Sequence, residues 1–379
     1  MEGYRELLDV ARRDNGLTNF GDTSFMEGLE ILVTSLNAEA DLNAAGEKAM
    51  RDTILRYLRQ RLEVEEWYRL HPETDEGTIM RPLFGVSLPR TGPTALSFLL
   101  ASDPDVRYLR MWESFQPFPP PSTVAGPDPR RGATSNTFGD EEGVRRHTPS
   151  GADGAFECQD LMALDFKSQI FIAYAKIPTY ADWLLDADLT PTYEFERRVL
   201  KMLQWGETPR PWRLKAPSHI IYMDHLDRAF PDAKFVMTHR DPTEVILSVA
   251  DVYADLQRHF TDTVDMGYVG ALNVTNWAEG MKRLIAFRDK PGNDSRFYDI
   301  HFRAMQDDPI GQVRGLYEWL GEPVTPQFEE GMAAFWEENE ARERYEKPDP
   351  AVFGIDYSDV RGQFSDYLRR MEQWVPVAR

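Results

Sequence analysis

Three times along the chain, a short apolar run is followed by a polar loop and then by a segment of helical character. This recurrence restricts the fold more than any other feature of the sequence. The runs are 83–88 (LFGVSL), 212–216 (WRLKA) and 234–239 (KFVMTH), and 296–302 is a fourth strand candidate. Strands separated by helices form parallel sheets, because a parallel pair needs a long crossover connection. We therefore expect an α/β fold with an open, mostly parallel sheet flanked by helices.

The other segments extend this core into one expected domain, 1–379. Apolar residues at helical spacing predict a helical N-terminal extension, 1–80. The nucleotide-binding core, 83–309, contains an insertion, 115–210, which begins with many prolines and then turns helical, so that it is placed to form a lid. C-terminal helices follow in 310–379, and the most acidic of them is expected within 322–347.

The chain has 43 Lys and Arg against 63 Asp and Glu, a formal net charge of −20. That balance excludes a protein that coats polyanions, so we expect no nucleic-acid partner. No stretch approaches the ~20 apolar residues of a membrane helix, and we expect no integral membrane segment. The single cysteine, Cys158, excludes an intramolecular disulfide and a multi-thiolate metal site. A cytoplasmic location is expected, and the sequence carries no signal for an oligomeric state.

The loop after the first strand has the composition of an anion site. Gly92 and Pro93 lie between the hydroxyls of Thr91 and Thr94, and Arg90 precedes them, at a point where backbone N–H groups open a helix. Such a loop binds phosphate or sulfate. It lacks the Gly-x-x-x-x-Gly-Lys pattern of a Walker A loop, and the chain contains no Gly-x-Gly-x-x-Gly. An ordinary strand-to-helix turn is the alternative interpretation.

A second candidate anion site follows the third run. Arg240 ends that strand, and Ser248 lies eight residues further, two turns along the next helix, so both can face one anion. Residues 197–240 contain nine Lys and Arg against four Asp and Glu, which leaves a local positive field inside an acidic protein. A structural ion pair between Arg240 and Asp241 or a neighbouring carboxylate is the alternative. An open α/β sheet binds nucleotides at the carboxyl ends of neighbouring strands, where both sites are expected.

These segments resemble the sulfotransferases that use 3′-phosphoadenosine 5′-phosphosulfate (PAPS), most closely the bacterial members. Residues 88–94 (LPRTGPT) are similar to the 5′-phosphosulfate loop of that family, and 234–248 is similar to its 3′-phosphate motif. Segments 103–113 and 212–217 also match, so that the resemblance covers about 83–309. It implies a P-loop-like fold and transfer of a sulfuryl group from PAPS to a hydroxyl of a small, apolar acceptor, with no metal.

The resemblance also implies a set of donor-binding residues. The 5′-phosphosulfate would be held by the first loop and the 3′-phosphate by the second motif, beside an aromatic ring for the adenine. In this chain, these positions are Arg90, Thr91, Gly92, Pro93 and Thr94, then Arg240 and Ser248, and finally Phe302, where cytosolic sulfotransferases commonly have Tyr.

Pro93 is a departure, because the family usually has Ser or Thr at this position. The change removes one backbone donor and one hydroxyl from the anion site, a loss of order 1–3 kcal/mol if nothing compensates. A non-catalytic nucleotide-binding homologue is therefore kept as an alternative. A P-loop phosphotransferase is a further alternative, disfavoured by the missing Gly-Lys-Ser/Thr.

Sulfuryl transfer resembles phosphoryl transfer, so cations that stabilise the leaving group should dominate catalysis. The expected cations are Arg90 and Lys215. Two residues compete to accept the proton of the acceptor hydroxyl: Glu113, which resembles the catalytic carboxylate of the bacterial and tyrosylprotein branches, and His219, which lies near the position of the cytosolic histidine. We favour Glu113. In the ordinary alternatives, Glu113 pairs with Arg110 and His219 only starts a helix.

Aromatic residues in and before the insertion suggest an apolar acceptor pocket. They are the stretch 112–121 together with Phe156, Phe166, Tyr174 and Trp183. Such a pocket suits a hydroxyl on a lipid, a steroid, a phenol or a polyketide-like molecule. The alternative is that these rings are plain core.

Overall fold

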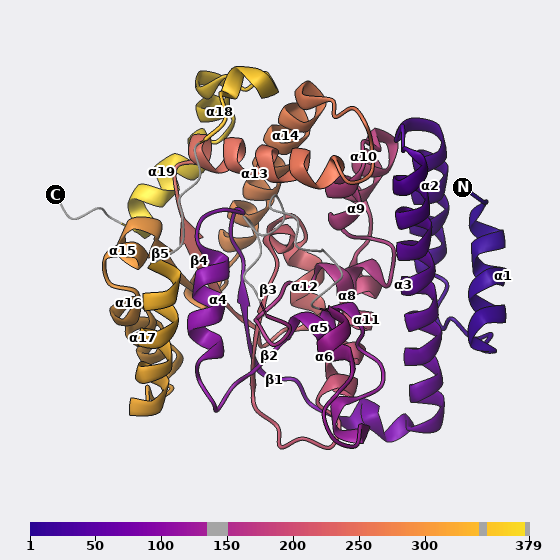
Figure 1. The fold of residues 1–379 in the computed structure, drawn as a ribbon. Helices are drawn as coiled ribbons and strands as arrows, with labels where there is room; N and C mark the ends of the chain where they lie inside the picture. Colours follow the sequence, from indigo (N-terminus) through magenta and orange to yellow (C-terminus); the bar gives the residue numbers. More distant parts are fainter. Residues whose placement is uncertain (135–150, 341–346, 376–379) are drawn as a thin grey trace.

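Five strands form one sheet in the order β2-β3-β1-β4-β5 in the computed structural model, which describes residues 1–134, 151–340 and 347–375 (Figure 1). Each pair of neighbouring strands is parallel. The predicted open parallel sheet flanked by helices is therefore confirmed. The strands are β1 (Met80–Gly85), β2 (Arg107–Tyr108), β3 (Pro211–Lys215), β4 (Lys234–His239) and β5 (Phe297–His301).

Two details of the sheet differ from the prediction. The two-residue strand β2 was not predicted, because two residues show no periodicity. Strand β1 ends at Gly85 rather than at residue 88. The backbone N–H of Val86 still donates to the carbonyl of Val236, but Pro89 has no N–H with which to continue the ladder.

Successive residues of the central strands supply two different cores. Phe84 and Phe235 belong to the larger core, whereas Leu83 and Val236 belong to the smaller one. This alternation follows from the period of two of a strand. The smaller core is covered by α4 (Pro93–Ala101), α15 (Phe302–Asp307), α16 (Pro309–Leu320) and α17 (Pro326–Glu340), which lie to the left in Figure 1.

The N-terminal extension is helical, as predicted. Its three helices stand along the right side of Figure 1, and their apolar faces join the larger core. Among these buried residues are Leu32 and Leu58, each 0% exposed. The helices are α1 (Tyr4–Asn15), α2 (Phe25–Glu39) and α3 (Ala44–Leu70), and a short 3₁₀ turn, η1 (Pro72–Glu76), leads into the sheet.

The insertion begins irregularly, as predicted, but its helical part is not a lid. Its buried residues, such as Leu161 and Val199, belong to the larger core together with the sheet and α3. The sequence predicts helix over 155–175 and 181–203, and each stretch is interrupted, the first near Phe166, which has a positive φ of 54°, and the second at Pro191, where a new helix begins. The elements are α5 (Met111–Phe115), η2 (Pro121–Thr123), α6 (Arg130–Thr134), α8 (Gln159–Ala163), α9 (Ile170–Tyr174), α10 (Pro178–Asp186) and α11 (Thr190–Leu203). Residues 135–150 of the predicted insertion lie outside the described residues.

The C-terminal helices pack against the end of β4. Tyr367 is buried, and its ring stacks on that of His239, at the end of β4. The remaining elements are η3 (Pro217–Ile221), α12 (Met223–Ala229), α13 (Pro242–Gln257), α14 (Met266–Arg288), η4 (Asp294–Arg296), η5 (Pro350–Phe353), α18 (Tyr357–Gln363) and α19 (Ser365–Trp374). Residues 341–346 of the predicted acidic helix and 376–379 of the C-terminal segment lie outside the described residues. No helix of the described ranges is long and apolar enough to cross a membrane.

Two Gly→Ala substitutions should change stability in opposite directions. A Cβ at Gly270 of α14 would lie 2.1 Å from the carbonyl oxygen of Phe353, so Gly270→Ala should lower the free energy of unfolding by about 1–3 kcal/mol. A Cβ at Gly362 of α18 meets nothing within 4 Å, so Gly362→Ala should raise it by up to about 1 kcal/mol. Urea unfolding followed by circular dichroism measures both. Equal effects of the two changes would contradict the close packing of α14 on η5.

Candidate active site

The strand register brings the predicted site residues to one edge of the sheet. Gly85 of β1 pairs with Lys215 of β3 and with Val236 of β4, so the carboxyl ends of the three central strands meet. Strand β4 continues to His239, which pairs with His301 of β5. The residues that follow this last pair are Arg240 and Phe302, which therefore leave the sheet side by side.

The loop between β1 and α4 has the backbone geometry of an anion site. Gly92 is the N-cap of α4 and has a φ of 97°, a conformation that favours glycine. A Cβ at this position would also lie 3.4 Å from the ring of Phe302. The first bond of the helix runs from the N–H of Leu96 to the carbonyl of Gly92, so the N–H groups of Thr94 and Ala95 have no acceptor within the helix. These free donors give the loop its attraction for an anion.

The side chains of Pro93 and Thr91 stabilise the loop, whereas the family resemblance implied that both residues bind the 5′-phosphosulfate. Pro93 is the first residue of α4, the position at which proline is favoured, so it removes one donor without disturbing the helix start. The Thr91 hydroxyl is fully buried, and it contacts the carbonyl oxygen of Leu88 at 2.8 Å and Thr238 Oγ1 at 2.6 Å. The Thr91 side chain therefore fastens the loop to β4, and only its backbone N–H is left to face a ligand.

Four of the predicted donor-binding residues converge beside this loop. Arg90 Nε donates to Ser248 Oγ at 3.0 Å. Arg240 Nη1 donates to the carbonyl oxygen of Arg90 at 2.9 Å, and the Arg240 guanidinium lies 4.4 Å from the centroid of the Phe302 ring. The structure thus brings together residues that are up to 212 positions apart in the sequence.

The electrostatics of this cluster favour a bound anion. Burial lowers the pKa of Arg90, and the neighbouring positive charge of Arg240 lowers it further. Within the part of the chain that the structure describes, no carboxylate lies within ion-pair distance of Arg90. The alternative ion pair considered for Arg240 is present: Arg240 pairs with the neighbouring Glu244 at 2.5 Å, whereas Asp241 pairs with Arg361. Glu244 pairs with Arg240 and not with Arg90, so the positive charge of Arg90 has no ion-pair partner among the described residues at the loop.

Lys215 contacts both the loop and a carboxylate that the sequence patterns did not identify. Its Nζ lies 3.1 Å from Thr94 Oγ1 and 2.8 Å from Glu157 Oε1. The Lys215 side chain is 5% exposed and that of Glu157 is 30% exposed, so the carboxylate is within reach of a ligand. Among the described residues, Glu157 is the carboxylate that pairs with Lys215, one of the two predicted cations.

The backbone before α8 holds Glu157 in this place. The N–H of Phe156 donates to the carbonyl of Leu109, and the N–H of Cys158 donates to the carbonyl of Lys215. These two bonds fix Glu157 between them. In the sequence, Glu157 is marked only as a charged residue between Phe156 and Cys158, at the start of an apolar stretch. That pattern does not predict that Glu157 contacts Lys215.

The geometry around Glu113 argues against its expected role as the base. Its side chain is fully buried, and its carboxylate is bonded to the guanidinium of Arg107 through both oxygens. It also accepts from the backbone N–H of Arg110 at 3.0 Å and pairs with the Arg110 side chain. A carboxylate held in this way stabilises the start of α5 and is not available to an acceptor hydroxyl.

His219 is also enclosed. It is 0% exposed in η3, its Nδ1 lies 2.9 Å from the hydroxyl of Tyr193, and its ring packs edge-on against Phe84. Burial lowers its pKa to about 3, so the imidazole is neutral. It lies among core side chains rather than at the loop that holds Arg90.

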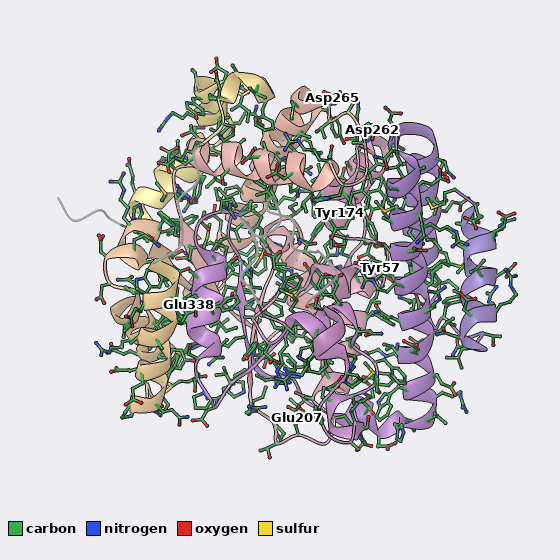
Figure 2. The ribbon with its side chains drawn as sticks, viewed as in Figure 1. Tyr57, Tyr174, Glu207, Asp262, Asp265 and Glu338 are labelled. Carbon is green, nitrogen blue, oxygen red and sulfur yellow. The ribbon has the colours of Figure 1, made fainter. Side chains whose placement is uncertain are left out.

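The aromatic residues expected to line one acceptor pocket fall into separate groups. Phe166 is fully buried and stacks on Phe171 in the larger core. Figure 2 shows Tyr57 and Tyr174 in the packed interior near α3, while Glu207, Asp262, Asp265 and Glu338 lie at the periphery. Trp183 packs against Tyr180. Phe156, which contacts Phe115 at a centroid distance of 5.4 Å, is the member of the set directly beside Glu157.

Comparison with known proteins decides the family. The model of the family described as "Sulfotransferase family" matches residues 82–326. This chain belongs to the sulfotransferase family. The matched region contains the whole cluster at the sheet edge, so the resemblance found in the sequence is confirmed. Membership implies a sulfonate donor.

Two solved sulfotransferases have the same fold over nearly the whole chain. STF1 from Mycobacterium tuberculosis H37Rv is 28% identical, with a TM-score of 0.83, over 96% of this chain and 98% of its own. STF9 from Mycobacterium avium is 28% identical, with a TM-score of 0.89, over 98% of this chain and 97% of its own. The similarity therefore includes the N-terminal and C-terminal helices as well as the core.

Curated relatives match a shorter region. The omega-hydroxy-beta-dihydromenaquinone-9 sulfotransferase Stf3 of Mycobacterium bovis and that of Mycobacterium tuberculosis are each 30% identical over 156 residues. The match spans 40% of this chain and 40% of each relative.

The two carboxylates should differ in their effect on stability. Glu113→Gln leaves the buried guanidinium of Arg107 without its charged partner, so it should lower the free energy of unfolding by about 2–4 kcal/mol. Glu157 is partly exposed, and the buried Lys215 keeps its contact with Thr94 Oγ1 and can still donate to the amide oxygen, so Glu157→Gln should cost less, about 1 kcal/mol. Thermal and urea unfolding of both variants measures the difference. A Glu113→Gln protein as stable as the wild type would reopen a catalytic role for Glu113.

Proposed function

We propose that this protein transfers a sulfuryl group from PAPS to a hydroxyl group of a small, apolar acceptor. The observation that carries the proposal is the convergence of Arg90, Arg240 and Ser248 beside the open N-terminus of α4. Two fixed guanidinium groups and free backbone donors suit a ligand with two separate anionic groups. PAPS has such groups at its 5′ and 3′ positions.

Each donor-binding residue has a role in this proposal. The N–H groups at the start of α4, together with Arg90 and Thr94, bind the 5′-phosphosulfate. Arg240 and Ser248 bind the 3′-phosphate, and the ring of Phe302 lies beside the adenine. Glu244, now paired with Arg240, gives up that contact when the phosphate arrives and keeps its bond to Lys347.

Catalysis follows from the triplet of Thr94, Lys215 and Glu157. In the transfer, the bond between sulfur and the leaving phosphate oxygen breaks, and a bond forms between sulfur and the acceptor oxygen. Arg90 and Lys215 stabilise the negative charge that grows on the leaving phosphate. Glu157 takes the role first expected of Glu113 or His219: it accepts the proton of the acceptor hydroxyl.

The surroundings of Glu157 suit an apolar acceptor. Phe156 is half-buried directly beside Glu157, and its contact with Phe115 gives an apolar wall next to the proposed base. The curated relatives are named for a hydroxylated menaquinone derivative. We infer that this chain also takes a hydroxyl on an apolar molecule, as the sequence suggested, and that it acts in the cytoplasm without a nucleic-acid partner.

The position of Pro93 weakens the alternative of a non-catalytic homologue. That alternative relied on a damaged anion loop, yet Pro93 occupies the one helix position that suits proline, and the N–H groups of Thr94 and Ala95 remain available.

Transfer of radiolabelled sulfuryl from PAPS to a panel of hydroxylated lipids, sterols and phenols tests the proposal. We expect turnover with at least one apolar alcohol. Glu157→Gln should lower kcat at least 100-fold while leaving the affinity for adenosine 3′,5′-bisphosphate unchanged. Glu194→Gln, on the exposed side of α11, is the matched control and should retain full activity.

Two outcomes would contradict parts of this proposal. If PAPS binds but no acceptor is sulfated, the protein is a nucleotide-binding homologue without transferase activity. If Glu157→Gln turns over normally, Glu157 is not the base.

A further inference from the structure

Behind Lys215, on the side of the larger core, three buried side chains face one another and take no part in the proposed reaction. They are Cys158, just before α8, Glu196 of α11 and His219 of η3, each 0% exposed. One potential ligand atom of each lies within 4.8 Å of those of the other two. The three residues come from three separate elements, so their approach is a property of the tertiary fold.

The polar atoms of this cluster are buried without strong hydrogen-bond partners. Both carboxylate oxygens of Glu196 and the Nε2 of His219 are buried, and among the described residues the one polar group that hydrogen-bonds with Glu196 is the thiol of Cys158, a weak donor. Within the described ranges, no Lys or Arg lies within ion-pair distance of Glu196. Burial of such atoms without a partner costs free energy, and native structures rarely leave them so. Three such atoms that face one another indicate a missing ligand between them.

A divalent cation satisfies this cluster better than a proton does. A proton on Glu196 would remove its charge and, donated to Nε2 of His219, would satisfy two of the three atoms, but the other carboxylate oxygen would depend on the Cys158 thiol, a weak donor. One divalent ion bound by a thiolate, a carboxylate and a neutral imidazole gives a net charge of zero, which a protein interior tolerates. Binding requires that the Cys158 thiol release its proton to solvent.

The ligand types select zinc among common divalent ions. Zn²⁺ prefers sulfur, imidazole nitrogen and carboxylate oxygen in tetrahedral geometry, with bonds of ~2.0–2.3 Å that place ligand atoms about 3.3–3.6 Å apart. The three ligand atoms lie within 4.8 Å of one another, so side-chain rotation that moves each atom by up to about 1 Å brings them into this range. Tyr193 contacts Nδ1 of His219 at 2.9 Å, the kind of second contact that directs Nε2 of a histidine towards a metal.

We propose that Cys158 Sγ, a carboxylate oxygen of Glu196 and Nε2 of His219 bind one structural Zn²⁺ ion. The second Glu196 oxygen or a water molecule completes the tetrahedron. The ion joins α11 and η3 to the segment that carries Glu157, and the N–H of Cys158 bonds to the carbonyl of Lys215. It therefore holds the Lys215–Glu157 pair in place from behind, without contact to the reacting groups. This site does not depend on the proposed function.

The metal content of the wild-type protein is the first test. We expect about one zinc per chain by inductively coupled plasma mass spectrometry after purification without chelators and dialysis against metal-free buffer. Protein produced with Co²⁺ in place of zinc should show a near-ultraviolet sulfur-to-cobalt absorption band. Because Cys158 is the single cysteine of the chain, that band can come from no other residue.

Substitutions then assign the ligands. Cys158→Ser should abolish the sulfur-to-cobalt band, and Glu196→Gln should lower the zinc content to below about 0.2 per chain. His225→Gln, at a half-buried histidine outside the cluster, is the matched control and should retain one zinc. A folded wild-type protein without stoichiometric zinc and without the cobalt band would overturn the proposal, whether or not the variants fold.

Discussion

Two guanidinium groups of like charge are held against one loop, and the arrangement of the active-site edge follows from how the fold keeps them there. Arg90 follows β1 and Arg240 follows β4, and these strands are hydrogen-bonded neighbours in the sheet. The repulsion between them is offset by the ion pair of Arg240 with Glu244, by hydrogen bonds to Ser248 and to the loop backbone, and by the ring of Phe302. A ligand with two anionic groups reduces this repulsion when it binds. The site therefore binds such a ligand more tightly than a neutral one.

The rest of the molecule keeps this edge rigid. Below it, strands β1, β3 and β4 lie between two cores that alternate residues share. At one end, the C-terminal helices pack Tyr367 against His239, directly before Arg240. On the other side, the segment before α8 presents Glu157 to Lys215. If Zn²⁺ occupies the Cys158–Glu196–His219 cluster, the same segment is also anchored from the interior.

The sequence predicted the features that local patterns encode. Apolar runs bounded by turn residues indicated the parallel sheet. Parallel strands present their carboxyl ends together, and this rule predicts that Arg90 and Arg240 lie at one edge, whereas Phe302 was placed beside them by the family resemblance. The motif at 88–94 indicated the family. These predictions succeeded because the register of the parallel strands alone places residues that follow different strands next to one another. The conformations of the long connections do not affect that placement.

Features that depend on how the insertion folds back were not predictable. Glu157 meets Lys215 only through backbone bonds between distant segments, so no periodicity marks it. Glu113 precedes the insertion and matched a motif, but a motif does not show that the side chain of Arg107, six residues earlier, is buried against it. The aromatic set was divided between the core and the site for the same reason, because composition does not say which ring points where.

Calorimetric titration with adenosine 3′,5′-bisphosphate, with AMP as the comparison ligand, tests the paired-cation site most directly. Wild-type protein should bind the bisphosphate with micromolar affinity and AMP at least 10-fold more weakly. Arg240→Ala should abolish this preference for the 3′-phosphate, since a charged hydrogen-bonding partner contributes about 1.5–3 kcal/mol. Arg314→Ala, at an exposed ion pair on α16, should leave it unchanged. Equal binding of both nucleotides, or a preference that survives in Arg240→Ala, would contradict the assignment of this edge as the donor site.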